Sequence, residues 1–194
     1  MKLFVHYIVN YLIELNMIDM DDAEIYYFGI AEGLLLIFNI ILTLLISVIL
    51  SDIKTGILFL FFFAPIRCYA GGYHAKTRKK CLFWSIAILV IALGGIKLLD
   101  SFGSELLILL YFISYKIGSE SPVENGNKPL NMNERIIYKK KTIHILCLED
   151  ILALLFWRIS PLITYVVVIA QIIEIILLIH GKRQLSNATD QEFS

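Results

Sequence analysis

The stretch Arg67-Cys-Tyr-Ala-Gly-Gly-Tyr-His-Ala-Lys-Thr-Arg-Lys-Lys-Cys81 separates two apolar runs and is the most informative segment of the chain. It contains a glycine pair, a histidine and a cysteine seven residues apart, and five cationic side chains without an acidic residue. Residues 55–66 before it and 82–96 after it are apolar enough to lie in a bilayer. The stretch is therefore predicted to be a basic connection at the edge of a membrane.

Composition extends this prediction to the whole chain. Of its 194 residues, 58% are hydrophobic, and the mean hydropathy is +0.76. A soluble domain of this length needs a larger polar surface. The 17 acidic and 17 basic residues are clustered, so a net charge of zero conceals local asymmetry. We expect an all-α, polytopic transmembrane helical bundle.

The apolar runs predict six membrane segments. Crossing a bilayer takes about 20 helical residues, and several runs are shorter than this, so the number falls to four if the short pairs are re-entrant. The six candidate segments are 33–51, 55–66, 82–96, 106–118, 143–157 and 159–179.

Two basic stretches, 67–80 and 119–142, are separated by two predicted segments. Short basic loops remain on the cytoplasmic side of a membrane. We therefore expect a multi-pass protein of a bacterial cytoplasmic membrane, with both termini and the stretch 67–81 on the cytoplasmic side.

The first residues predict an amphipathic helix over about 1–18 rather than a cleavable signal. Its apolar residues at helical spacing are Phe4, Ile8, Tyr11, Leu12, Leu15 and Ile18. This stripe suits either an interfacial helix or one packed on the bundle. The expected organisation is one membrane-embedded domain over 1–183, including this helix, followed by a disordered cytoplasmic tail over 184–194.

The chemistry of the stretch 67–81 is compatible with nucleophilic catalysis, although most such histidine and cysteine pairs are incidental. A cysteine attacks as the thiolate, which cationic neighbours and a helix N-terminus favour, and His74 could serve as the general base. On a continuous helix, residues seven apart stand roughly 10 Å apart along the axis. We therefore expect Gly71 and Gly72 to turn the chain, and Thr77 to cap a helix carrying Cys81 in its first turn.

Several motifs closely resemble the signature of the AgrB-type accessory gene regulator protein B family. They are Arg67 with Ala70-Gly-Gly-Tyr-His-Ala75 and Cys81, then Ser121-Pro-Val-Glu-Asn125, Asn127-Lys-Pro-Leu130 and a basic helix over 134–141. The order of hydrophobic and basic blocks agrees over residues 1–183. Departures such as Cys68 after Arg67 do not affect the histidine or the cysteine.

The resemblance implies a membrane cysteine endopeptidase in which His74 and Cys81 are catalytic. The implied substrate is an AgrD-like precursor peptide with an amphipathic leader, a core and an acidic tail. The thiolate releases the tail, and the resulting thioester closes into a thiolactone or lactone signal peptide for quorum sensing. No cofactor is implied, a homodimer is an option, membrane lipid surrounds the chain and nucleic acid is not a partner.

Other residues are assigned lesser roles. The residues proposed to bind substrate or form an oxyanion hole are Arg67, Gly71, Gly72, Lys76, Arg78, Lys79, Lys80 and Lys128. Glu149, Asp150 or Asn125 could orient His74 as a third member, although structural hydrogen bonding is the simpler role for the two acids. No metal site is expected from Cys68, His74 and Cys81, because the spacing is irregular and a fourth ligand is missing. Cys68 and Cys147 are expected to be packed thiols.

Two other classes of function remain open from the residues. A small membrane transporter or exporter of a peptide or ion would use the intramembrane acids, and a structural membrane scaffold would need no reactive group. Neither needs a cysteine beside a histidine, so substitution of Cys81 or His74 separates them from a peptidase.

Overall fold

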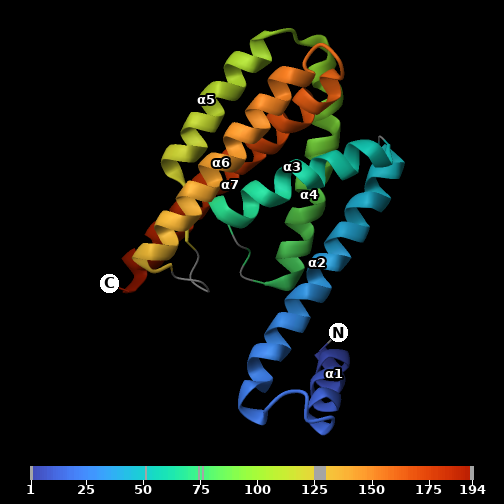
Figure 1. The fold of residues 1–194 in the computed structure, drawn as a ribbon, viewed down its shortest axis with the longest axis vertical. Coiled ribbons are helices and arrows are strands. Elements are labelled where there is room, and N and C mark those ends of the chain that lie inside the picture. The colour runs from blue at the N-terminus through green and yellow to red at the C-terminus, as the bar shows by residue number, and fades with distance from the viewer. Residues whose placement is uncertain (1, 51, 74, 76, 125–129, 193–194) are drawn as a thin grey trace. The chain divides into compact units, whose positions relative to one another are not determined.

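The computed structural model describes residues 2–50, 52–73, 75, 77–124 and 130–192; side chains at 2, 32, 78, 79, 100 and 187–192 are outside the description. Within the described residues the chain is helical and has no β-strand beyond a Gly71–Val123 bridge, which confirms the all-α prediction. The helices are α1 (Lys2–Glu14), η1 (Met20–Asp22), α2 (Ala23–Leu50), α3 (Ile53–Ala70), α4 (Arg78–Leu98), η2 (Leu99–Ser101), α5 (Glu105–Glu120), α6 (Met132–Phe156) and α7 (Pro161–Glu192) (Figure 1). They form two compact units, Met1–Leu42 and Thr43–Ser194.

The first unit pairs α1 with the beginning of α2. Val5 and Val9 of α1 are buried against Ala31 of α2. This packed face is not the apolar stripe predicted from the sequence, because Phe4 and Tyr11 of that stripe are exposed. Residues 5 and 9 are also one helical turn apart, so α1 has apolar residues on two faces. Packing on α2 selects one of them, and the exposed face remains apolar.

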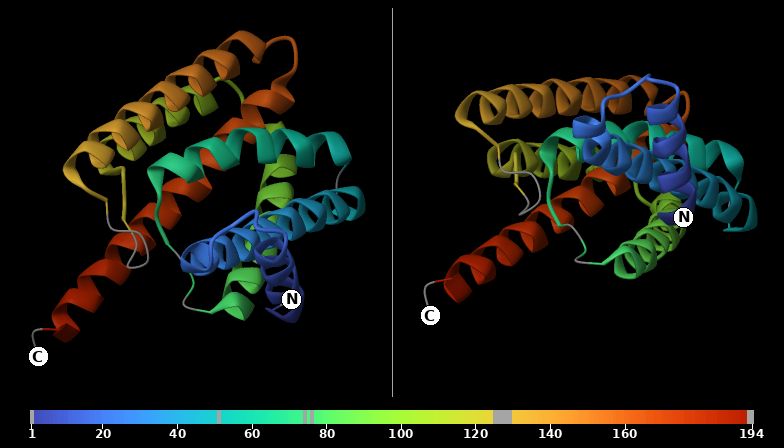
Figure 2. Two further views of the ribbon diagram at one scale, coloured as in Figure 1. Left: turned by 60° about the horizontal axis from the view of Figure 1, so that its bottom comes forward. Right: turned by 90° about the horizontal axis from the view of Figure 1, so that it is seen from below.

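The centre of the second unit is α7, which packs against α3, α4, α5 and α6. Val166, Val167, Val168 and Ala170 are fully inaccessible, so α7 is enclosed on every side in this region. A helix that is apolar all round belongs in a core. Figures 1 and 2 show α5 and α6 running alongside α7, with α3 and α4 completing the enclosure.

Four helices are long and apolar enough to cross a membrane among the described residues, namely α2, α3, α4 and α7. The predicted run 55–66 extends into an 18-residue α3 that continues through Pro65. By contrast, α5 has only 16 residues, and α6 carries Glu149 and Asp150 after a basic first half. Six segments remains a prediction for the number of crossings.

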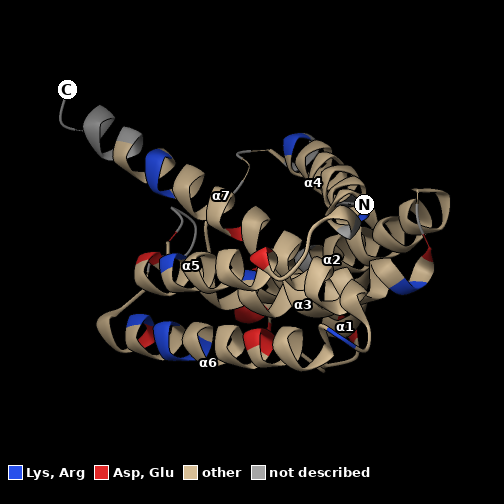
Figure 3. Ribbon diagram, turned by 90° about the horizontal axis from the view of Figure 1, so that it is seen from above, with Lys and Arg blue, Asp and Glu red and all other residues tan. Residues whose placement is uncertain are grey.

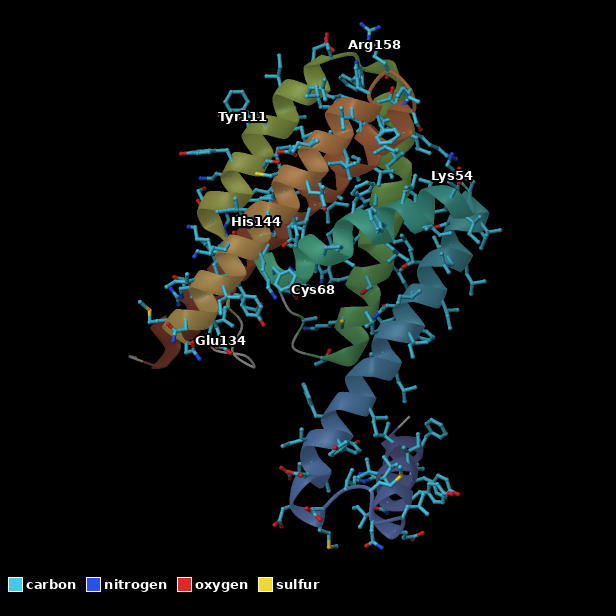
Figure 4. The ribbon with its side chains drawn as sticks, viewed as in Figure 1. Lys54, Cys68, Tyr111, Glu134, His144 and Arg158 are labelled. Atoms are coloured by element: carbon cyan, nitrogen blue, oxygen red, sulfur yellow. The ribbon has the colours of Figure 1, made fainter. Side chains whose placement is uncertain are left out.

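The two basic stretches meet at one end of the second unit. Lys141 lies 4.7 Å from the ring centroid of Tyr69, and its Nζ is 3.4 Å from the Tyr69 hydroxyl. Figure 3 shows Lys and Arg along the first part of α6, and Figure 4 shows Glu134 at this end and Arg158 at the other. Tertiary structure thus joins regions that the sequence analysis assigned to one side of the membrane.

The expected tail differs in conformation from the structure. Residues 184–192 continue α7 as a helix, where the sequence predicts disorder. Just before these residues, Lys182 of α7 forms an ion pair with Glu120 of α5. Lys116 of α5 also contacts Glu120, at 2.9 Å. The Lys182–Glu120 pair ties the end of α5 to α7.

Candidate functional site

The glycine pair between α3 and α4 makes a sharp, well-anchored turn. Gly71 and Gly72 have φ angles of 79° and 110°, conformations that other L-residues rarely adopt. The Gly72 amide donates to the Val123 carbonyl at 3.2 Å, and the Val123 amide donates to the Ala70 carbonyl at 2.8 Å. The turn expected from the sequence is therefore present, and it is held by the segment after α5.

Glycine is also required here by space. A Cβ atom on Gly71 would lie 2.1 Å from the Val123 carbonyl oxygen, and one on Gly72 would lie 3.0 Å from the Leu177 carbonyl oxygen. On the opposite wall, a Cβ on Gly181 would lie 2.6 Å from the Gly72 carbonyl carbon. The turn is thus pressed between the segment at Val123 and the backbone of α7.

The amides of the turn are already bonded. Gly71 donates to the Arg67 carbonyl at 3.3 Å, and Tyr73 donates to the Leu177 carbonyl at 2.8 Å. Since Gly72 donates to Val123, all three successive amides have backbone acceptors. In this arrangement the two glycines shape the backbone rather than present free donors to an oxyanion.

Arg67 fastens the turn from the end of α3. Its guanidinium donates to the carbonyl oxygens of Gly71 and Tyr73. One nitrogen also lies 3.8 Å from the Glu174 carboxylate. Arg67 is 21% exposed, whereas the Glu174 side chain is fully inaccessible. The planar fork of arginine can bind two carbonyls at once, so it links both sides of the turn.

Glu174 places a buried carboxyl group beneath this arrangement. Neither of its oxygens accepts a hydrogen bond from the described residues, so the Arg67 ion pair is the interaction that the structure describes for it. A buried carboxylate is costly unless it is paired. Glu174 lies within an apolar run of the sequence, but no spacing or motif joins residue 174 to residue 67.

The expected cap of α4 is confirmed. The Thr77 side chain accepts from the Lys80 amide, and the Cys81 amide donates to the Thr77 carbonyl at 2.9 Å. Cys81 is in the first turn, and its side chain is exposed. Because α3 ends at Ala70 and α4 begins at Arg78, no continuous helix joins positions 74 and 81.

His74 itself lies outside the described residues, between Tyr73 and Ala75. The same applies to Lys76, Asn125 and Lys128, and to the side chains of Arg78 and Lys79. Lys80 is described and exposed, next to Cys81. The structure therefore places Tyr73 and Cys81, on either side of the proposed catalytic loop. The positions of the His74 imidazole and of most nearby Lys and Arg side chains remain predictions.

Glu149 and Asp150 belong to a second polar cluster, between α5, α6 and α7. Ser114 Oγ lies 2.8 Å from Asp150 Oδ1, and Gln171 Nε2 lies 3.1 Å from the same oxygen. Gln171 Nε2 is also 3.5 Å from Glu149 Oε2. These contacts agree with the structural hydrogen bonding favoured above for the two acids.

The three cysteines are free and exposed in the chain. For Cys68 and Cys147 this corrects the expectation of packed thiols, because both side chains are exposed. Figure 4 labels Cys68 near the end of α3. Within the described part of the chain, no group of three His, Cys, Asp or Glu side chains is arranged to hold a metal ion.

Together the fold and the site define a helical membrane protein with an exposed cysteine beside a loop shaped by glycine and held by a buried charge. Residues 4–178 match the family described as Accessory gene regulator B, and the chain belongs to this family. It is 26% identical over 163 residues to AgrB-like protein 2 of Clostridium perfringens strain 13 / Type A, covering 78% of this chain and 72% of that protein. An AgrB-like protein of C. perfringens strain SM101 matches with the same identity and coverage. No solved structure matches significantly.

Proposed function

We propose that the protein is a membrane-embedded cysteine endopeptidase that cleaves the tail from an AgrD-like precursor and promotes its cyclisation. The observation that carries the proposal is the exposed Cys81 in the capped first turn of α4, seven residues after His74. Membership of the accessory gene regulator family supports this use of the two residues.

Cys81 lies beside positive charge in the first turn of α4. The positive end of the α4 dipole and the ammonium of Lys80 both stabilise a nearby negative charge. In the proposed reaction His74 takes the proton from the thiol, and sulfur attacks the carbonyl that ends the peptide core. The C–N bond then breaks, His74 returns the proton to the leaving amine, and a thioester joins the core to Cys81.

Cyclisation restores the enzyme. A thiol or hydroxyl of the peptide core loses its proton to His74 and attacks the thioester carbonyl. The bond to Cys81 breaks, the Cys81 sulfur regains a proton, and the ring is released. The acyl group stays activated throughout, so the protein must keep water from it, which an apolar enclosure achieves.

The basic end of the bundle suits an acidic tail. Described cations at this end include Lys80, Lys141 and Lys182. Attraction between these cations and an acidic tail is electrostatic and is weakened by salt. We propose that this end faces the cytoplasm of a bacterium, since short basic loops are retained there.

Tail release in proteoliposomes tests the proposal. Replacing Cys81 by Ala should lower the rate at least about 1,000-fold, because no nucleophile remains. Replacing His74 by Gln should lower it about 100-fold or more. The matched control is Cys68→Ala, which removes another exposed thiol and should leave the rate within about two-fold of wild type.

Mass spectrometry supplies a second readout. We expect a hydroxylamine-sensitive adduct of the peptide core on Cys81. Undiminished tail release by the Cys81→Ala protein would contradict the proposal and favour the transporter or scaffold functions instead.

A further inference from the structure

An apolar cavity of about 220 Å³ lies between α4 and α7. The side chains that define it for this argument are Tyr73, Trp84, Ile88, Ile91, Ile173 and Ile176. Ile173 is buried, whereas Ile88 and Tyr73 are partly exposed, so the cavity combines a closed floor with an accessible side. Neither the motifs nor the apolar runs indicated it, because its two walls are about 90 residues apart in the chain.

Two residues of the cavity wall, Tyr73 and Trp84, lie close in sequence to the proposed catalytic residues. Tyr73 immediately precedes His74, and its amide is fixed to the Leu177 carbonyl at 2.8 Å. The Tyr73 and Trp84 rings meet edge to face, with centroids 6.3 Å apart. This aromatic pair forms a rim that joins the loop to α4.

Helical spacing connects the cavity directly to Cys81. Positions 81, 84, 88 and 91 follow one another at intervals of three, four and three, and therefore share one face of α4. Trp84, Ile88 and Ile91 from this face form a cavity wall. The thiol thus stands at the N-terminal end of that wall, one helical turn before Trp84.

We propose that this cavity is the subsite for a large apolar side chain of the precursor, namely that of the residue whose carbonyl Cys81 attacks. The inference rests on the proposed function, because it assigns an occupant through the reacting carbonyl. A side chain attached to the residue under attack must lie within a few ångströms of the sulfur. The cavity wall formed by Trp84, Ile88 and Ile91 lies on the helix face that also carries Cys81.

The size and chemistry of the cavity define the class of side chain. An engineered apolar cavity of about 150 Å³ holds benzene, so a cavity of this size admits an aromatic ring or a branched aliphatic group. Its walls are mainly aliphatic and aromatic, with the Tyr73 hydroxyl and the His180 imidazole as the polar groups. A charged or small polar side chain would lose hydration there and would have few partners to replace it.

Filling the cavity tests the assignment. Ile88→Trp adds volume from α4, and Ile176→Trp adds volume from α7. Val90→Trp is the matched control, because residue 90 is 44% exposed on α4 and does not line the cavity. Each full-length protein is assayed in proteoliposomes with the native precursor and with a precursor carrying Gly at the residue before the cleaved bond.

We expect the wild type to prefer the native precursor by about ten-fold or more in kcat/KM. Ile88→Trp and Ile176→Trp should lower kcat/KM about ten-fold for the native precursor and about two-fold or less for the Gly precursor. Val90→Trp should process both precursors like wild type.

Three outcomes would overturn the subsite. They are unchanged processing by both filling variants, an equal loss for both precursors, and a loss that depends on the acyl chains of the vesicle, which would indicate a lipid site. Failure of the proposed function looks different, because it leaves the native precursor uncleaved by wild type or cleaved without Cys81.

Discussion

The two ends of the helical bundle in residues 43–194 are held together by different kinds of interaction. At the end with Cys81, a positive-φ glycine pair is pressed against α7 and fastened by Arg67 over a buried Glu174. At the other end, α3 begins with an ordinary cap in which Asp52 accepts from the Thr55 amide at 2.8 Å and from its hydroxyl at 2.9 Å.

The two ends differ in how far apart in sequence the contacting residues lie and in the free energy that their burial costs. The Asp52 cap involves residues three apart and remains near solvent. The Arg67–Glu174 pair joins helices 107 residues apart in sequence and includes a carboxylate without solvent access. Burial of a charge and strained backbone both cost free energy, and such costs concentrate where a fixed geometry is needed. The comparison therefore indicates that the loop containing His74 is the segment whose position matters most.

Among the substitutions that test this comparison, Gly72→Ala is expected to have the largest effect. The new Cβ would lie 2.6 Å from an Arg67 nitrogen and 3.0 Å from the Leu177 carbonyl, at a φ of 110°. The turn must shift, and a displacement of about 1 Å can lower a rate about 100-fold. Tail release in proteoliposomes should fall by that factor.

The control for this prediction is Gly94→Ala. A Cβ on Gly94 would meet nothing within 4 Å, so this helical glycine should accept alanine without loss of activity. Equal activity of the two variants would mean that the turn tolerates displacement.

A smaller effect is expected from Glu174→Gln, which preserves shape and removes the charge below Arg67. Breaking a fully buried pair costs about 3–5 kcal/mol, and because Arg67 is 21% exposed the cost should be nearer about 2 kcal/mol. Tail release should fall about ten-fold, chiefly in kcat, since the pair positions the loop rather than contacting substrate.

A double-mutant cycle with Arg67→Met separates this coupling from general destabilisation. The double variant should be little worse than Arg67→Met alone, because Arg67 also holds the Gly71 and Tyr73 carbonyls. Arg67→Lys should not restore activity, because a lysine ammonium lacks the fork that binds the Gly71 and Tyr73 carbonyls. Strictly additive losses would argue against the pair as a positioning device.

The smallest effect is expected at the opposite end, from Asp52→Ala. Hydrogen bonds from Thr55 lower the pKa of the Asp52 carboxyl below its usual value. A lowered folded-state pKa stabilises the protein above the unfolded-state pKa, near 3.9, and this contribution is lost as pH falls through the folded value. Loss of the cap should cost about 1 kcal/mol at pH 7, without changing tail release.

Thermal unfolding in detergent at pH 7 and at pH 3 checks this prediction. The difference between wild type and Asp52→Ala should shrink at the lower pH, where the wild-type carboxyl begins to be protonated. A difference that is the same at both pH values would show that charge on Asp52 does not strengthen the cap.

Local spacing in the sequence determined the helical membrane class, the turn at Gly71 and Gly72, and the Thr77 cap before Cys81. These features depend on residues within a few positions of one another, where backbone geometry and hydrophobic periodicity act directly. The candidate catalytic residues were found in the same way, through a motif contained in residues 67–81.

Tertiary structure alone decided which distant groups meet. It placed Glu174 beneath Arg67, brought Val123 and Gly181 against the glycine turn, selected Val5 and Val9 as the packed face of α1, and formed the cavity between α4 and α7. A helix with apolar residues on several faces satisfies its own hydrogen bonds in any rotation about its axis. Close packing against particular neighbours fixes that rotation, and no spacing within one segment encodes it.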